Sequence, residues 1–470
     1  SHIHLTATGL LRTGLDLSSA TSRRHCLQLL ADYVARHPGQ PVWGHGWDDT
    51  AWPGEPAPST AEIDAVVGTA PAYLARVDVH SAVASSALRD LVVGLAAVAG
   101  FDPQGPLSAD AHHLVRAEAR RLLTWRQRDD ARRAALDAAA AAGIVAVHEC
   151  AGPQIGGAED WQEVRGTEHG VEVVGYWGEA VSTAAQARAL IDATGAAGLA
   201  GDLFVDGALG SHTAWLCRPY ADAPDRTGNC YLDPTVIAEH LSACTEAGVT
   251  AGFHVIGDAA AAAVVDALEA VVERFGAPAV ARCGHRLEHL EMVSEEQAAK
   301  LGAWGIVASM QPNFDALWGG ADGMYARRLG VDRAARLNPF ALLASAGVPL
   351  AFGSDAPVTA LDPWATVRAA GHHHTPGSAI SMRAAFAAAT RGAWRAGGVR
   401  DGITGTLVPG APASYAVWET LNLDVAAPAD GVARWSTDPR SRVPALPRLD
   451  PSDPLPRCRQ TVHRGVVLHG

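Results

Sequence analysis

The chain has 470 residues and a formal net charge of −13 at pH 7, with 37 Lys and Arg against 50 Asp and Glu. This length exceeds one ordinary domain but suits a single (β/α)8 barrel with additional segments. The acidic balance, without a basic cluster interleaved with aromatic residues, argues against a nucleic-acid partner and favours a small-molecule substrate.

Hydropathy and cysteine usage predict a cytoplasmic protein. No apolar run approaches the ~20 residues of a membrane span, and the first residues lack a signal-peptide pattern, so we expect no membrane partner. The 7 Cys include no CxxC pair, which argues against a disulfide framework and against a thiolate zinc site. Assembly into a homo-oligomer is left open by the sequence.

Short apolar runs alternate with Ala-rich helical stretches along the chain. Strands are expected around Ile3 and at 143–149, 171–177, 203–206, 249–255, 285–290, 305–311 and 348–355. Strands alternating with helices predict a parallel sheet, and eight such units predict a closed barrel. The predicted fold class is therefore α/β, a (β/α)8 TIM-type barrel.

Two stretches interrupt this alternation. The connection after the first strand is far longer than a usual loop, so residues 10–140 are expected to form an inserted subdomain over the barrel mouth. Short strands at 414–418 and 465–468, joined by a Pro-rich extended segment at 439–456, predict a small β-sandwich-like appendage. The expected domains are the barrel (1–9 and 141–400), the insertion (10–140) and the C-terminal appendage (401–470).

Imidazole and carboxylate side chains stand at the ends of the predicted strands. His2 and His4 are two residues apart on the first strand, so both point to one face and can bind the same metal ion. His254, His289 and Asp355 end the fifth, sixth and eighth strands. Because the carboxyl ends of barrel strands meet at one mouth, these five residues predict a metal centre for Zn²⁺ or another divalent ion.

Asp355 is the expected catalytic residue. A carboxylate beside a metal can accept the proton of an attacking water and deliver it to a leaving nitrogen. The alternative is that Asp355 caps the turn in Ser354-Asp355-Ala356-Pro357.

Several phrases occur together with these histidines, namely 74–81 (LARVDVHS), 204–211 (FVDGALGS), 287–289 (LEH), 310–312 (MQP) and 353–358 (GSDAPV). In combination they resemble the metal-dependent amidohydrolase superfamily, and within it the branch that includes the N-substituted formamide deformylases. The resemblance covers nearly the whole chain. It implies hydrolysis of an amide or other non-peptide C–N bond by a metal-activated water, and it implies that the natural chain begins before Ser1.

Many members of the superfamily bridge two metals with a carboxylated lysine on strand four. Here that position is Asp202, and the only lysine, Lys300, falls in a predicted surface helix. We therefore favour one Zn²⁺, with two ions bridged by an ordinary carboxylate as the alternative. Asp206 and Glu149 are expected to reach the centre better than the deeper Asp202, or each acid fixes the tautomer of a histidine instead.

The resemblance also suggests residues near the substrate. Arg76 and His80, with Asp78 between them, resemble family residues beside the substrate, although an internal ion pair would explain Arg76 equally well. His212 stands where relatives often have Arg, and Trp318 is expected to line an apolar pocket or to belong to the core.

Two other functions fit the same residues. A deaminase of an amino-substituted ring uses similar ligands with one metal and releases ammonia, and a catalytically silent barrel would have only a binding role. The substrate itself is not readable, because specificity resides in the insertion and the loops.

Overall fold

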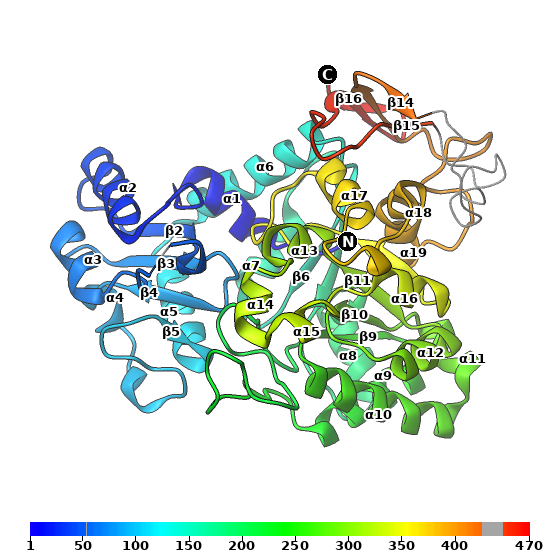
Figure 1. Ribbon diagram of the computed structural model, residues 1–470, viewed down its shortest axis with the longest axis horizontal. Helices are drawn as coiled ribbons and strands as arrows, with labels where there is room; N and C mark the ends of the chain where they lie inside the picture. The colour runs from blue at the N-terminus through cyan, green and yellow to red at the C-terminus, as the bar shows by residue number, and fades with distance from the viewer. Residues whose placement is uncertain (53, 425–444) are drawn as a thin grey trace.

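The computed structural model describes residues 1–52, 54–424 and 445–470, so residues 439–444 of the predicted extended segment lie outside the described residues. Its centre is a parallel sheet of seven strands in the order β12-β11-β10-β9-β8-β7-β6 (Figure 1). The strands are β6 (Ala146–Ala151), β7 (Glu172–Trp177), β8 (Gly198–Leu199), β9 (Thr250–Val255), β10 (Arg286–His289), β11 (Val307–Met310) and β12 (Leu350–Phe352). The predicted α/β class with a parallel sheet is confirmed.

The sheet curls so far that a single residue contacts both of its edges. Ile3 forms a parallel bridge with Glu149 of β6 and another with Ala356, which follows β12. The first predicted strand is thus reduced to one pairing residue between His2 and His4. Ile3 itself is 2% exposed and packs outward, so both histidines point to the inside of the curled sheet.

The fourth strand differs from its predicted position. It was expected at 203–206, but the regular strand β8 is Gly198–Leu199, and in the predicted segment only Phe204 pairs, with His254. Between Leu199 and Phe204, the backbone leaves the hydrogen-bonded ladder of the sheet. This departure decides where Asp202 points.

Helices cover the outer side of the curled sheet. Figure 1 shows α9 to α12 along the strands β9 and β10. The main core lies between these layers, where Phe253, Leu268 and Leu287 are at most 1% exposed. The helices of this region are α7 (Gly157–Gly166), α8 (Ala184–Thr194), α9 (Pro234–Ala247), α10 (Asp258–Phe275), α11 (Ala277–Cys283), α12 (Glu295–Trp304), α13 (Pro312–Trp318), α14 (Met324–Leu329), α15 (Val331–Ala334), α16 (Phe340–Ser345), α17 (Pro363–Gly371), η3 (Pro376–Ser378), α18 (Met382–Ala387), η4 (Ala388–Gly392) and α19 (Ala393–Ala396).

The segment between Ile3 and β6 forms a separate layer beside the curled sheet, blue to cyan in Figure 1. Its sheet has the order β1-β2-β3-β4-β5, and apolar clusters fill both faces. The elements are α1 (Leu5–Thr13), β1 (Leu15–Asp16), α2 (Arg23–Arg36), β2 (Val42–Trp47), η1 (Asp49–Ala51), α3 (Thr60–Val67), β3 (Ala72–Arg76), β4 (Ser81–Ala84), α4 (Ser86–Arg89), η2 (Leu95–Ala97), β5 (Leu107–Ser108), α5 (Ala109–Arg121) and α6 (Trp125–Ala141). The turn between β3 and β4 carries Asp78 and His80 towards the barrel.

The C-terminal residues form short antiparallel strands. β13 (Tyr415–Glu419), β16 (Arg457–His463) and β17 (Val466–His469) make one sheet in the order β13-β16-β17, and β14 (Leu423–Asp424) pairs with β15 (Leu446–Pro447). The central strand β16 was not predicted, because its polar residues hide the strand pattern. In the part of the chain that the structure describes, no helix is long and apolar enough to cross a membrane.

Candidate metal centre

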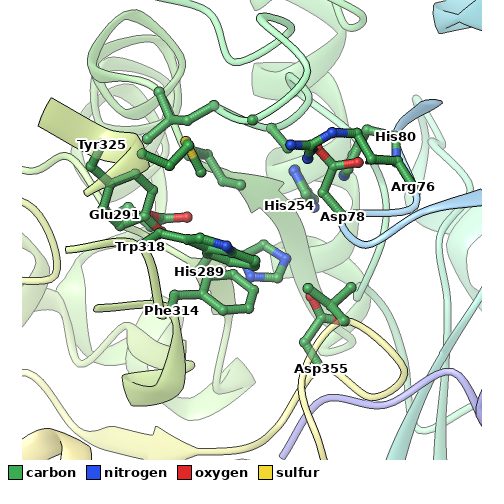
Figure 2. Close-up of a pocket in the computed structure, with 16 residues that line it drawn as sticks. Arg76, Asp78, His80, His254, His289, Glu291, Phe314, Trp318, Tyr325 and Asp355 are labelled. Atoms are coloured by element: carbon green, nitrogen blue, oxygen red, sulfur yellow. Dashed lines mark hydrogen bonds and ion pairs between the residues drawn. The ribbon is translucent and has the colours of Figure 1, made fainter. Parts of the chain in front are cut away.

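Six buried or nearly buried side chains meet at the carboxyl ends of the central strands. Three groups each place one donor atom per residue within 4.8 Å of the others. The groups are His2 with His289 and Asp355, His2 with His4 and Asp202, and Asp202 with His254 and His289. The structure therefore brings together the five predicted metal ligands and adds Asp202. Figure 2 shows His254, His289 and Asp355 around one space.

The local backbone explains how these side chains face inward. His254 lies between Phe253 and Val255 on β9, and both neighbours belong to the outer core. His289 ends β10 and Asp355 follows β12, with φ angles of 71° and 54°, in the left-handed region. Such conformations cost of order 1–3 kcal/mol for a residue other than glycine, so the surrounding packing must hold them.

Hydrogen bonds orient three of the four histidines from the side away from the centre. His2 Nδ1 lies 2.9 Å from Glu288 Oε2, and His289 Nδ1 lies 2.8 Å from Gln311 Oε1. His254 Nε2 is 3.2 Å from the carbonyl oxygen of Gly207. These contacts occupy one ring nitrogen of His2, His254 and His289 and leave the other for the centre, as in typical protein metal sites.

Glu288 is itself held by a buried arginine. Arg286 Nη2 donates to Glu288 Oε2 at 2.9 Å, and both side chains are 0% exposed. Burial alone would raise the pKa of Glu288, but Arg286 and His2 outweigh it and hold that pKa far below its usual value. Arg286, Glu288 and Gln311 were not among the predicted site residues. The available signal in the sequence was that Arg286 and Glu288 are two residues apart and therefore share the inward face of β10.

The donor atoms at the centre fit a divalent cation. His2 Nε2, His254 Nδ1, Asp202 Oδ1 and Asp355 Oδ1 are buried and have no hydrogen-bond partner among the described residues. Buried polar atoms are normally paired, and imidazole nitrogens with carboxylate oxygens are the usual ligands of Zn²⁺. Burial opposes protonation of His4, yet Asp202 and Asp355 raise its pKa to about 9. The centre therefore attracts positive charge.

Asp202 lies close to three of the four histidines. Its Oδ2 is 3.0 Å from His4 Nε2, and its Oδ1 is 3.4 Å from His2 Nε2 and 3.5 Å from His254 Nδ1. The expectation that Asp206 and Glu149 reach the centre better is wrong. It assumed that Asp202 lies deep in a regular strand, whereas the backbone leaves the ladder there.

Asp206 and Glu149 instead bind backbone amides. Asp206 accepts the N–H groups of Ile256 at 3.0 Å and Gly257 at 2.7 Å, and it is 0% exposed. Glu149 Oε2 accepts the N–H of Leu5 at 2.6 Å. Both acids fix the backbone beside the ligand residues.

A cavity opens from the centre towards the turn between β3 and β4 and towards α13. It encloses about 380 Å³ of empty space, part of it open to solvent, which is at the lower end for small-molecule pockets. His254, His289 and Asp355 line it together with Arg76, Asp78 and His80, and apolar side chains of α13 and α14 form the other wall (Figure 2).

Three of the four predicted substrate contacts line this cavity. Arg76 does so while pairing with Asp48 at 2.7 Å, Asp49 at 3.0 Å and Asp78 at 2.7 Å, so the internal ion pair is present. The ring centroid of His80 is 5.1 Å from that of His254. Trp318 packs on Phe314 at the cavity wall.

His212 does not line the cavity, contrary to expectation. Its φ of 55° turns the residue, and its Nε2 lies 3.0 Å from Asp222 Oδ1. The ring also packs edge-on against Tyr220. The motif does not encode the turn geometry that sets this direction.

The family model described as Amidohydrolase family matches residues 1–469, so the chain belongs to this family and is a hydrolase acting on C–N bonds. It is 27% identical over 472 residues to Protein LONG AFTER FAR-RED 3 of Arabidopsis thaliana, covering 91% of this chain and 79% of that protein. It is 31% identical over 171 residues to YtcJ of Bacillus subtilis strain 168, which is named an amidohydrolase; that match covers 36% of this chain and 30% of YtcJ.

Two solved structures share the fold. An uncharacterized metal-dependent hydrolase from Pyrococcus furiosus has a TM-score of 0.64 and 24% identity over 88% of this chain and 84% of its own. Its counterpart from Pyrococcus horikoshii OT3 has a TM-score of 0.66 and 24% identity over 88% and 83%. The formamide deformylase branch stays a prediction.

Proposed function

We propose that this amidohydrolase cleaves an amide or another non-peptide C–N bond of a small molecule with a metal-activated water. The observation that carries the proposal is the group of buried ligand atoms on His2, His254, Asp202 and Asp355 that have no hydrogen-bond partner among the described residues; His254 and Asp355 also line the cavity. Family membership and the hydrolase relatives support the reaction class.

The residues proposed to hold the ion are His2, His4, His254, His289 and Asp355, and Zn²⁺ is the metal that this donor set favours. When bound, such an ion polarises a carbonyl group and lowers the pKa of water. We favour one ion. The alternative is two ions bridged by Asp202, and it is supported by the membership of Asp202 in two of the groups of candidate ligands.

Asp355 is the proposed proton carrier. It lines the cavity and has an unpaired Oδ1, which is 3.5 Å from His2 Nε2 and 3.4 Å from His4 Nε2. In the proposed reaction a C–O bond forms to water and the C–N bond breaks. Asp355 accepts a proton from the water and gives it to the departing nitrogen, which leaves as an amine.

The cavity walls supply the proposed substrate contacts. Arg76 and His80 present nitrogen atoms on the side of the insertion, and Trp318 presents an apolar surface opposite them.

We also propose the division into the barrel (1–9 and 141–400), the insertion (10–140) and the appendage (401–470), because sheet pairing changes near each boundary. A cytoplasmic location stays a prediction.

A deaminase of an amino-substituted ring is the second candidate, since it also hydrolyses a C–N bond at such a centre. A screen over formamides, N-acyl compounds and cyclic amides, on protein of measured metal content, tests the proposal. Release of an amine and a carboxylic acid supports amide cleavage, whereas ammonia from a ring amine supports deamination. Bound metal without any hydrolysis would favour a binding role.

A further inference from the structure

An acidic side chain without a full set of partners lines the inner wall of the cavity. Glu291 follows the ligand residue His289 by two positions and is 2% exposed. Its Oε2 has no hydrogen-bond partner among the described residues, and the side chain is one of the groups that line the cavity. No step of the proposed hydrolysis uses this carboxyl group.

The surroundings of Glu291 are aromatic. A row of rings runs along this wall, with centroid separations of 5.8 Å from His289 to Phe314, 5.0 Å from Phe314 to Trp318 and 6.2 Å from Trp318 to Tyr325. Figure 2 shows Glu291 beside Tyr325 and Trp318. The row therefore joins the metal centre to the carboxyl group.

Two further polar groups lie next to Glu291. The backbone N–H of Asn338 donates to the Glu291 carbonyl oxygen at 2.9 Å. The side-chain amide of Asn338 and the hydroxyl of Tyr325 are buried beside the Glu291 carboxyl group, close enough to lower its pKa against the opposing effect of burial, but within the described chain neither makes a hydrogen bond of good geometry. A polar pocket of this kind inside an apolar wall is built to receive a ligand group, because unpaired buried polar atoms are costly.

The charge of the cavity favours a cation at this position. Of the cavity-lining residues that the structure describes, Arg76 is the one with a permanent positive charge, and it is surrounded by Asp48, Asp49 and Asp78. A carboxylate combined with the faces of Trp and Tyr rings is a typical binding site for an ammonium group.

We propose that Glu291, with Trp318 and Tyr325, binds a protonated amine at the end of the substrate that lies away from the scissile bond. The inference rests on the proposed function, because it takes the C–N bond at the metal centre as the other end of the substrate. The substrate class is then an N-acyl or N-formyl derivative of a diamine, and hydrolysis releases a free diamine.

The test is a binding measurement that does not depend on turnover. Mono-N-formyl diamines of several chain lengths are compared with N-formyl alkylamines and N-formyl amino alcohols of equal length. Each is titrated calorimetrically into the metal-loaded full chain carrying Asp355→Asn, which blocks the proposed proton transfer. The same titrations are repeated with Glu291→Gln added and, as a matched control, with Glu295→Gln added, since Glu295 is an exposed carboxylate on α12.

With Glu291 intact we expect the diamine derivative of the best length to bind at least about tenfold more tightly than its uncharged counterparts. Glu291→Gln should remove most of that preference and Glu295→Gln none of it. The inference would be overturned if the charged compounds bound no more tightly than the uncharged compounds or the alcohols, or if no compound bound. It would also be overturned if Glu291→Gln left the preference unchanged. The first comparison uses no Glu291 variant, so a folding defect of Glu291→Gln cannot obscure it.

Hydrolysis is measured separately on the chain with Asp355 intact. Selective binding of the diamine derivatives without any amide cleavage would leave the Glu291 inference standing and contradict the proposed function. Cleavage of formamides without selectivity for the charged compounds would support the proposed function and contradict the Glu291 inference.

Discussion

His2 Nδ1 lies 2.9 Å from Glu288 Oε2, and both side chains are fully buried. This contact turns His2 Nε2 towards Asp202 and Asp355. Arg286 holds Glu288 from the other side. One row of buried side chains therefore fixes the orientation of the first histidine of the candidate metal centre.

Glu288→Gln should weaken metal binding and destabilise the fold. The amide loses the charge that orients His2, and loss of such a partner typically costs 10–100-fold in metal affinity. It also leaves Arg286 buried without its counter-charge, which costs about 3–5 kcal/mol of unfolding free energy. Chelator competition and urea unfolding measure the two effects. The surface variant Glu295→Gln should change neither, and a Glu288→Gln protein with normal affinity would show that His2 is positioned by other contacts.

Reconstitution with metal should not need bicarbonate. Lys300, the only lysine, lies on α12 and pairs with Glu269 at 3.0 Å and Glu296 at 3.3 Å, far from a bridging role. Apoprotein prepared without bicarbonate should regain its hydrolase activity with Zn²⁺ alone, and Lys300→Arg should keep it. Reactivation that requires bicarbonate would contradict this assignment.

Metal stoichiometry decides the role of Asp202. If a single ion is bound, titration saturates near one equivalent, and Asp202→Asn changes affinity without changing that number. Saturation near two equivalents that falls to one in Asp202→Asn would replace the favoured arrangement by two ions with an Asp202 bridge. Elemental analysis of dialysed protein gives the result directly.

His80 and His212 form a matched pair for testing the cavity. His80 lines it beside His254, whereas His212 binds Asp222 outside it. We expect His80→Ala to lower kcat/KM by about tenfold or more, because lost substrate contacts cost of order 1–3 kcal/mol, and His212→Ala to change it less than about twofold. Equal losses in the two variants would place the substrate elsewhere.

The sequence was most informative where strand geometry alone determines position. A period of two places His2 and His4 on one face, and parallel strands bring His254, His289 and Asp355 to the same end, so this set needed no knowledge of loops. Asp202 was ranked last because the prediction assumed a regular fourth strand, and irregular backbone has no such period.

Residues placed by turns and distant helices could not be predicted. The direction of His212 depends on one positive φ angle, and the environment of Glu291 depends on α13 and α14, which follow it by more than twenty residues. Packing of that kind is a tertiary property that local pattern does not encode.

The most direct test of the proposed hydrolysis is the rate of the Asp355→Asn variant at matched metal content. The amide keeps the shape of the carboxylate but cannot accept the proton of water at neutral pH. With the best amide from the screen, we predict that kcat falls by about 10²–10⁴-fold while the metal is at least partly retained and the fold is unchanged by circular dichroism. A metal-loaded Asp355→Asn protein that keeps more than about a tenth of the rate would contradict the account, because Asp355 would then not be the proton carrier.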